Sequence, residues 1–291
     1  MNSSRSNSDL IRKKPGAISA SAMNSVSAAS TARRRKDLET GGGAVRRLHF
    51  PTYRASQPAP GCRRNISMSL TYSLAPTAYA CKFRHSVILL DVARDRYLRL
   101  AGVQFDLYRE IALGTSPRSR SSCFAARLVR EGIIVEGAIG RTLIASDRAQ
   151  TELLSEGITS LGTDPIKVAE VGRFVRSLNT ARRLRRQTHL RTQFELAATW
   201  KSSSAQVTPA LVAAKGAKFQ SLAPFFFSTH NACLLRSLAL LNFLFRSGVC
   251  ADWVFGVRDT PFAAHCWIEA GPMVLNDEPD HIASYHRILT I

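Results

Sequence analysis

The stretch "STHNACLLRSLALLNFLF", residues 228–245, decides how the rest of the chain is interpreted. Polar residues and Cys233 come first, and an apolar run follows that is broken only by Arg236, Ser237 and Asn242. The pattern predicts a buried helix that begins near Cys233. The dipole and unpaired N–H groups at a helix start favour an anion, so a thiolate nucleophile is one interpretation. Cysteine is also among the most buried residue types, so plain core packing is the alternative.

The residues after this helix supply the other groups that a thiol enzyme needs. Strands are predicted in 251–257, in "PFAAHCWIEAG" around His265, and in "PMVLNDEPD", which ends at Asn276 and Asp277. A histidine takes the proton of the thiol, and a carboxylate on the other ring nitrogen fixes the tautomer. The order of the residues therefore predicts Cys233 as nucleophile, His265 as base and Asp277 as its orienting acid.

Other interpretations of these residues are open. A histidine on an apolar strand is often a hydrogen-bonded core residue, and Asp277 opens a turn where aspartate is common. Cys266 and Cys250 are rival nucleophiles, but Cys266 is expected on the strand face opposite His265.

A metal site could use Cys233, His265, Cys266 or His281. Because no pair of these residues has a usual zinc spacing, no metal is predicted.

Composition limits the class of protein. The chain has 291 residues, 45% of them hydrophobic, which is enough for one large domain or two small ones. No segment reaches the ~18 apolar residues of a membrane span, so no membrane partner is expected. The six cysteines form no CxxC pair, which favours reduced thiols and a cytoplasmic location.

The first quarter of the chain is basic. Residues 1–67 hold thirteen of the Lys and Arg residues against three acidic ones, within a total net charge of +19. This segment is rich in Ser, Ala, Gly and Pro, and we predict a disordered basic extension. A nucleic-acid arm and a transit peptide are alternatives. The small number of aromatic residues in this segment argues against a nucleic-acid partner, and the working protein is expected to begin near Met68.

Beyond the extension, the pattern predicts an α+β fold in two domains. Strands, two helices and a closing strand in 68–140 predict a small winged-helix-like module, and 141–164 is predicted to be a linker. Residues 165–291 form the second domain. Its first helical region carries an arginine cluster that could bind phosphate or nucleotide, although such a run is more often a solvated helix face. The cluster consists of Arg173, Arg176, Arg182, Arg183, Arg185 and Arg186.

Residues 233–280 resemble the core of the transglutaminase-like cysteine proteases that mature lasso peptides, the B proteins of those gene clusters. The shared features are a Cys-Leu-x-Arg-Ser helix, a Gly-Val-Arg strand end, Pro-Phe-x-x-His-x-Trp-x-Glu and Asn-Asp. They stand here at Cys233, Leu234, Arg236, Ser237, Gly256, Val257, Arg258, Pro261, Phe262, His265, Trp267, Glu269, Asn276 and Asp277. Cys266 departs from the family pattern, in which small residues such as Ala or Ser are usual.

The resemblance implies a transglutaminase-like, papain-like protease domain preceded by a winged-helix-like leader-recognition domain. The activity it implies is a leader peptidase that cuts a precursor peptide by a Cys-His-Asp mechanism. The freed core amine would pass to an asparagine-synthetase-like lasso cyclase. ATP is expected to assist cleavage at a site that the sequence leaves open, and no covalent cofactor is expected.

The leader is expected to add a strand beside residues 97–101 and the helix 123–130. The residues predicted to contact it are Tyr97, Arg99, Phe124 and Leu128. Two other functions are open: a transglutaminase or amidase on the same fold, and a leader-binding chaperone with a dead site.

Overall fold

The computed structural model describes residues 71–114, 119–137, 140–143, 156–157, 165–203, 208–227 and 233–291. All of them belong to one compact unit, Leu48–Ile291. The predicted extension 1–67 and most of the predicted linker 141–164 lie outside the described residues.

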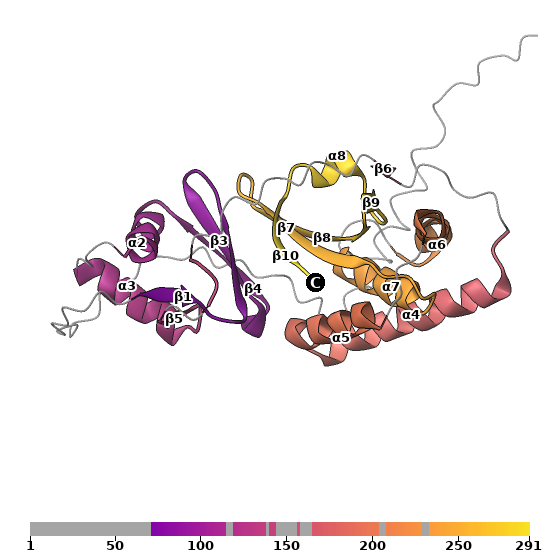
Figure 1. Ribbon diagram of the computed structural model, residues 1–291, viewed down its shortest axis with the longest axis horizontal. Coiled ribbons are helices and arrows are strands. Elements are labelled where there is room, and N and C mark those ends of the chain that lie inside the picture. Colours follow the sequence, from indigo (N-terminus) through magenta and orange to yellow (C-terminus); the bar gives the residue numbers. More distant parts are fainter. Residues whose placement is uncertain are drawn as a thin grey trace, which may run out of the picture. The chain divides into compact units, whose positions relative to one another are not determined.

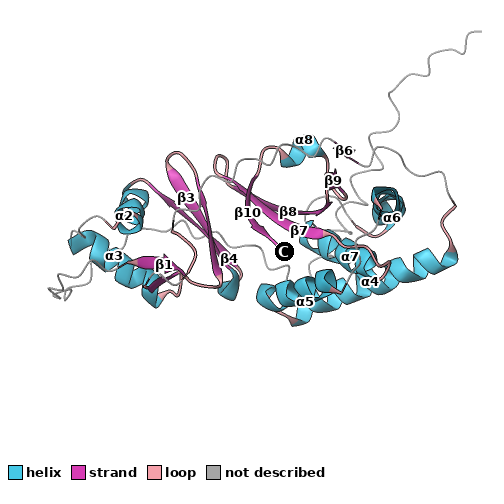
Figure 2. Cartoon of the chain, viewed as in Figure 1, coloured by secondary structure: helices cyan, strands magenta, loops and turns pink. Residues whose placement is uncertain are grey.

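The described chain contains both helices and strands, mostly in runs of one kind (Figures 1 and 2). In order, they are β1 (Tyr72–Leu74), β2 (Ala78–Lys82), β3 (Ser86–Asp91), η1 (Val92–Arg94), β4 (Arg96–Ala101), α2 (Val103–Ala112), α3 (Ser119–Arg130), β5 (Ile134–Glu136), β6 (Glu156–Gly157), α4 (Val168–Gln187), α5 (Leu190–Ser202), α6 (Pro209–Leu222), η2 (Ala223–Phe225), α7 (Cys233–Phe245), β7 (Asp252–Arg258), β8 (Ala263–Ala270), β9 (Met273–Val274), α8 (Pro279–Ile282) and β10 (His286–Thr290). The mixed α+β fold class is confirmed.

The first part of the described chain contains two small antiparallel sheets and two helices. Strands β2, β3 and β4 form one sheet in that order, and β1 pairs with β5. The sequence predicted this succession of strands, helices and a closing strand, except for β2. Its sequence "AYACK" has no β-branched residue and two small alanines, so it gives little strand signal.

Strand β3 is buried on both faces. Val87 and Leu89 belong to the core that α2 and α3 cover. Ile88 and Leu90 belong to a second core, which contains the helices and strands of the C-terminal part. A strand covered on both sides needs a continuous apolar run, as the sequence "SVILL" provides.

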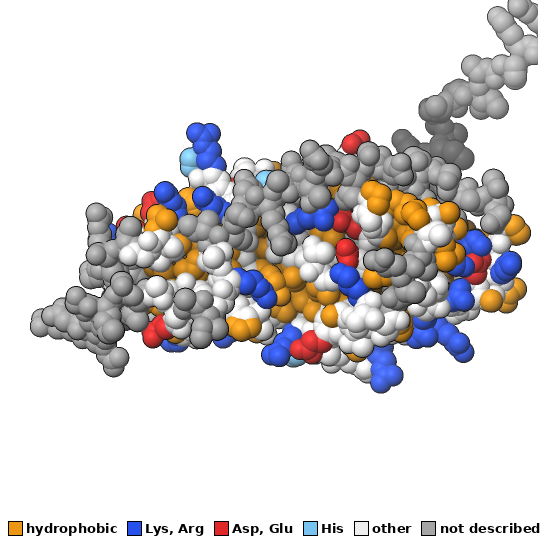
Figure 3. All heavy atoms as spheres, viewed as in Figure 1, with side chains coloured by type: hydrophobic (Ala, Val, Ile, Leu, Met, Phe, Trp, Pro, Cys, Tyr) orange, Lys and Arg blue, Asp and Glu red, His pale blue; other side chains and the backbone are white. Residues whose placement is uncertain are grey.

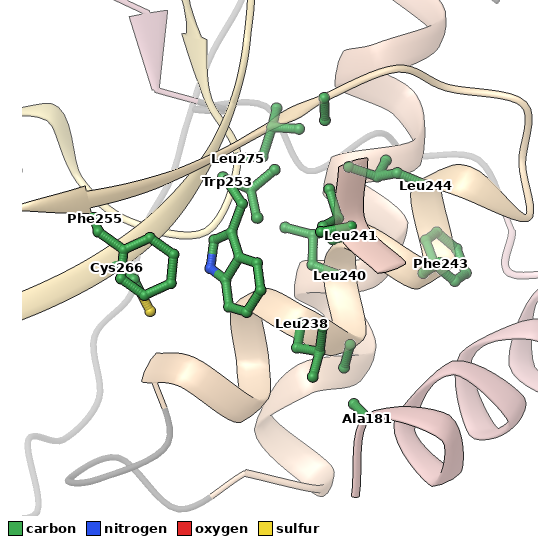
Figure 4. Packing of buried hydrophobic residues seen from close by; sticks show 14 of the residues in the cluster. Ala181, Leu238, Leu240, Leu241, Phe243, Leu244, Trp253, Phe255, Cys266 and Leu275 are labelled. Atoms are coloured by element: carbon green, nitrogen blue, oxygen red, sulfur yellow. The ribbon is translucent and has the colours of Figure 1, made fainter. Parts of the chain in front are cut away.

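The second part has a five-stranded sheet with the order β10-β7-β8-β9-β6. Helix α7 packs on one face of this sheet, and α4 lies on the far side of α7 (Figure 1). Trp253, Phe255 and Cys266 from the sheet meet Leu238 and its neighbours from α7 in this core (Figure 4). The opposite face of the sheet carries a smaller apolar cluster of Val254, Trp267, Val274, Ile282 and Tyr285.

Three predicted boundaries differ from the structure. The helical region after residue 165 is two helices, α4 and α5, which are separated at Thr188 and His189. Strand β9 ends at Val274 rather than at Asp277, because the side chain of Asn276 takes over the contact with β8. Strand β10 was not predicted, and it closes the outer edge of the sheet beside β7.

Within the described residues, no helix combines the length and the apolar character that crossing a membrane requires.

Candidate active site

Cys233 is the first residue of α7 and is half-buried. The apolar residues that follow it fix the helix against the sheet, because Leu238, Leu240 and Phe243 have no exposed surface. Burial of the helix body therefore presents its first residue at the edge of the core. The position agrees with the prediction of a cysteine at a helix start.

His265 lies on β8 directly opposite Gly256 of β7. Its ring stacks on Trp267 with a centroid distance of 5.9 Å and contacts Tyr285 at 5.4 Å. A Cβ on Gly256 would lie 2.6 Å from the Trp267 ring, so only glycine allows this ring to lie across β7. Gly256 of the Gly-Val-Arg segment thus packs against Trp267 of the His-x-Trp segment, and His265 stacks on this tryptophan.

Asp277 lies in the turn after β9 and joins two histidines. Its Oδ2 is hydrogen-bonded to Nε2 of His265. Its Oδ1 lies 2.8 Å from Nδ1 of His281 and accepts a 2.8 Å hydrogen bond from the backbone N–H of Glu278. Because Asp277 occupies Nε2, the His265 nitrogen that remains for Cys233 is Nδ1.

The charges of the site favour an ion pair between Cys233 and His265. Hydrogen bonding from the Cys266 thiol lowers the pKa of Cys233, burial opposes this effect, and hydrogen bonding to His265 adds to it, so the net pKa is well below the ordinary cysteine value. Burial lowers the pKa of His265, but its hydrogen bonds to Asp277 and Cys233 outweigh this and raise the pKa to about 9. The arrangement therefore holds a thiolate and an imidazolium together at neutral pH.

The carboxyl group of Asp277 is ionised in this arrangement. Burial raises its pKa, whereas hydrogen bonds from His265, His281 and the Glu278 backbone lower it, to about 2 overall. A charged carboxylate beside the ring stabilises the imidazolium, as the predicted orienting role requires.

A buried polar network aligns α7 with the strands that carry the site. Asn276 donates from Nδ2 to Ser237 Oγ at 2.9 Å, and its Oδ1 accepts from the backbone N–H of Ile268 at 2.8 Å. Ser237 Oγ in turn donates to the backbone carbonyl of Cys266 at 3.1 Å. The sequence analysis gave Ser237 and Asn276 no role, and their presence in the shared motifs was the only available signal.

A second buried network holds β10 against β8. Glu269 accepts hydrogen bonds from Trp267 Nε1 at 2.6 Å and from Arg287 NH2 at 2.9 Å. Its other oxygen lies 2.8 Å from Arg287 NH1, which makes the ion pair bidentate. The pair fixes the Trp267 ring on which His265 rests.

The rival cysteines differ from Cys233 in their surroundings. Cys266 is 3% exposed and lies in the core under the sheet, and burial raises its pKa well above the ordinary value. Cys250 lies at the other end of α7, with Sγ 3.9 Å from the carbonyl of Lys201. Cys233 is the described cysteine whose pKa is lowered by an interaction with His265, the histidine paired with Asp277.

The same acid and histidines are the candidates for a metal ion. Ligand atoms of His265, Asp277 and His281 lie within 4.8 Å of one another. The metal site considered in the sequence analysis also included His265 and His281, and the structure brings these two histidines together with Asp277.

A cavity of about 400 Å³ opens beside the acid of the site. Gln220, Arg236, Leu275, Asp277 and His281 are among the residues that line it. Gln220 is held in place by hydrogen bonds to Arg236 and to the carbonyl of Leu275. The cavity borders Asp277, and neither Cys233 nor His265 is among the residues that line it.

Two of the four predicted leader-binding residues lie close to the catalytic core. Tyr97 packs against the cluster that contains Cys233, with its ring 6.2 Å from that of Phe262. Arg99 forms an ion pair with Asp259, with Nε and Oδ1 2.6 Å apart. Strand β4, which carries both residues, has β3 as its partner on one side and no strand on the other among the described residues.

The other two predicted leader-binding residues point into the core of the first part. Phe124 is 8% exposed and Leu128 is 3% exposed. Their assignment to leader binding stays a prediction, and a peptide could reach them only where the edge of this core opens.

The arginine cluster lies on α4. Asn179, Arg182, Arg183, Arg186 and Gln187 line a surface cavity of about 600 Å³. Figure 3 shows Lys and Arg side chains in blue over the part of the surface where α4 and α5 run in the same view. The cavity is a candidate site for a polyanion.

Comparisons with known proteins agree with this geometry. The model of the transglutaminase-like superfamily matches residues 171–290. A stretch of 48 residues is 44% identical to the microcin J25-processing protein McjB of Escherichia coli, and it covers 16% of this chain and 23% of that protein. No solved structure gives a significant match.

Proposed function

Because residues 171–290 match the model of the transglutaminase-like superfamily, we propose that this protein is a thiol peptidase that processes the precursor of a lasso peptide. The observation that carries the proposal is the hydrogen bond of His265 to Asp277, together with the interaction with Cys233 that raises the pKa of this histidine. The similarity to a microcin-processing protein supports a precursor peptide as the substrate.

The three residues divide the reaction between them. The Cys233 thiolate attacks the carbonyl carbon at the leader–core junction, and a carbon–sulfur bond forms. As the carbon–nitrogen bond breaks, the His265 imidazolium gives its proton to the leaving amine of the core. Neutral His265 then takes a proton from the water that hydrolyses the thioester and releases the leader. Asp277 holds the ring in position throughout.

The free edge of β4 is the proposed binding site for the leader. An extended peptide can pair with the unpaired N–H and C=O groups of an edge strand. Because Tyr97 and Arg99 of this strand contact the catalytic part, a leader bound here would extend toward the reacting groups. The asparagine-synthetase-like cyclase remains the proposed recipient of the freed core.

The proposed ATP site is the arginine-lined cavity on α4. Arg182, Arg183 and Arg186 lie at helical spacing on one face, and guanidinium groups bind phosphate oxygens bidentately. If this assignment is right, replacement of the three arginines by Gln removes the ATP stimulation of cleavage and leaves the rate without ATP unchanged.

The experiment that tests the peptidase uses the full chain and a synthetic precursor with its leader. Mass spectrometry is expected to show one cut, which Cys233→Ala abolishes while leader affinity, measured by fluorescence anisotropy, is retained. Cys250→Ala is the matched control because Cys250 lies away from the triad, and its cleavage rate should equal that of the wild type.

Other products would identify the alternatives. A crosslinked peptide or released ammonia would identify a transglutaminase or amidase. If Cys233→Ala supports maturation as well as the wild type, the protein is a leader-binding chaperone.

A further inference from the structure

Cys266 is a second thiol near Cys233, the proposed nucleophile. Cys266 follows His265 on β8 and has 3% of its surface exposed. Its Sγ lies 3.8 Å from Ser237 Oγ on α7, and Cys233 packs against the buried cluster to which Cys266 belongs.

The backbone places Cys266 beside the first turn of α7. Cys233 and Ser237 are four positions apart and lie on the same face of α7. The Ser237 hydroxyl holds the carbonyl of Cys266 at 3.1 Å and so fixes β8 against the first turn of the helix. Figure 4 shows Cys266 beside Phe255 and Trp253, whose rings enclose it on the side away from solvent.

The two cysteines differ in exposure and in reactivity. Cys233 is half-buried and borders the open part of the site, whereas Cys266 lies in the core. An oxidant therefore meets Cys233 first. The thiolate is the form that reacts with peroxides, and the position of Cys233 at the first residue of α7 favours that form.

We propose that Cys233 and Cys266 form a reversible disulfide under peroxide, which switches the enzyme off and protects its nucleophile. The proposal rests on the reactive thiol of the proposed function, but it does not depend on the identity of the substrate.

The reaction takes place in two balanced steps. The Cys233 thiolate attacks one oxygen of hydrogen peroxide, the O–O bond breaks, and Cys233 sulfenic acid and hydroxide are formed. The Cys266 thiol then attacks the sulfenic sulfur, the S–O bond breaks, and water leaves as the disulfide forms. Each disulfide uses one peroxide as the oxidant, and a dithiol reductant returns both residues to thiols by exchange.

Replacement of Cys266 removes this partner of the sulfenic acid. Cys250 lies at the far end of α7 and cannot reach Cys233 without unfolding the helix. A second peroxide then converts Cys233 to sulfinic acid, which dithiols do not reduce. A reversible disulfide in the presence of Cys266 and a sulfinic acid in its absence therefore distinguish a working switch from simple oxidation.

The test treats the full chain with hydrogen peroxide and follows Cys233 in two ways. Peptide mapping without reduction is expected to show a Cys233–Cys266 crosslink with the mass of both peptides less two hydrogens. Alkylation of Cys233 by iodoacetamide should be lost after peroxide and return after dithiothreitol. Both readouts work without a peptide substrate, so failure of the peptidase proposal and failure of this one are distinguishable.

The variants compare each protein with its own untreated state. For Cys266→Ala, the alkylation of Cys233 before peroxide is the reference, and little of it is expected to return after dithiothreitol, with sulfinic acid at Cys233. Cys250→Ala should recover as the wild type does, and Cys266→Ser serves if the alanine variant is poorly folded. Equal recovery in the wild type and the Cys266 variants, or a wild-type map with Cys233 sulfinic acid and no crosslink, would overturn the proposal.

Discussion

At the scale of single residues, the site works by distributing charge among groups that are half-buried. His265 would be neutral at pH 7 if burial acted alone, because burial lowers its pKa. Asp277 reverses that effect through a direct hydrogen bond, and His281 and the Glu278 backbone keep Asp277 ionised. The thiolate of Cys233 is therefore maintained by residues in the turn after β9 as well as by its own helix.

Replacement of Asp277 by Asn tests this chain of effects. The amide cannot stabilise an imidazolium, so the pKa of His265 should fall from about 9 toward the ordinary ~6.5. The active ion pair exists below the pKa of His265 and above that of Cys233, so the alkaline limb of the pH profile moves to lower pH. We expect kcat/KM at pH 8 to fall by about 10²-fold or more.

The profile is measured as kcat/KM between pH 5 and 10 for both proteins. An alkaline limb that stays in place in Asp277→Asn would mean that Asp277 does not set the ionisation of His265. Treatment with EDTA is the companion measurement, since a metal held by the same residues would make activity sensitive to chelation, and we expect no loss.

Gly256 tests the support under the histidine. In Gly256→Ala the new Cβ meets the Trp267 ring at 2.6 Å, and Trp267 is 1% exposed and cannot move freely. We expect a loss of about 1–3 kcal/mol in the free energy of unfolding, as for other overpacked cores. The cleavage rate should fall with it, because His265 stacks on the displaced ring.

Gly172 on α4 provides the matched control. A Cβ there meets no atom within 4 Å, so Gly172→Ala should stabilise the helix by roughly 0.5–1 kcal/mol. If steric contact is the cause, the melting temperature falls in Gly256→Ala and rises in Gly172→Ala. A decrease in melting temperature for both would assign the effect to glycine loss in general.

At the scale of elements, ion pairs between helices hold the layer behind α7. Glu170 on α4 is 4% exposed and accepts from Lys215 and Lys218 of α6 at 3.1 and 3.0 Å. The side chain also bonds the backbone N–H of Lys167 and so closes the start of its own helix. Sequence patterns could not indicate this buried carboxylate, because charge on a helix is normally read as solvated surface.

Glu170→Gln should destabilise the protein in a pH-dependent way. Burial raises the pKa of Glu170, but its bonds to Lys218, Lys215 and Lys167 lower it to about 2 overall. A carboxyl group whose folded pKa is depressed stabilises the fold above its unfolded value of ~4.5, and this stabilisation is lost as the pH falls toward 2. We expect a difference of about 1–3 kcal/mol at pH 7.

Urea titrations of wild type and Glu170→Gln at several pH values measure this difference. The two unfolding free energies should converge as the pH falls through 4.5. A difference that persists unchanged at pH 3 would show that charge at Glu170 is not its source.

At the scale of the whole molecule, the sheet of the N-terminal part is shared between two cores. Ile88 and Leu90 have no exposed surface and belong to the core of the catalytic part, whereas Val87 and Leu89 belong to the other core. Residues 165–291 therefore do not cover their own apolar surface completely. The predicted boundary separates residues 68–140 from residues 165–291, but one apolar core contains residues from both ranges.

The consequence is measurable in a fragment. We expect residues 165–291 alone to lack the cooperative thermal transition of the full chain, because Ile88, Leu90 and Val92 no longer cover the core. A fragment of residues 71–291, which retains the sheet, is the matched control and should melt as the full chain does. If the short fragment melts cooperatively at the same temperature, the sheet is dispensable for the catalytic part.

The sequence by itself determined the α+β class, most helices and strands, and the order of the three site residues. These features depend on periodicity and on motifs within 48 consecutive residues, which are visible before any folding. It did not predict β2 or β10, since β2 has small residues and β10 lacks a boundary signal. Only the tertiary structure decided that Cys266 lies against Cys233, that Ser237 and Asn276 join α7 to β8, and that Glu170 pairs with two lysines. Each of these contacts joins atoms far apart along the chain, and their distances are set by packing rather than by local propensity.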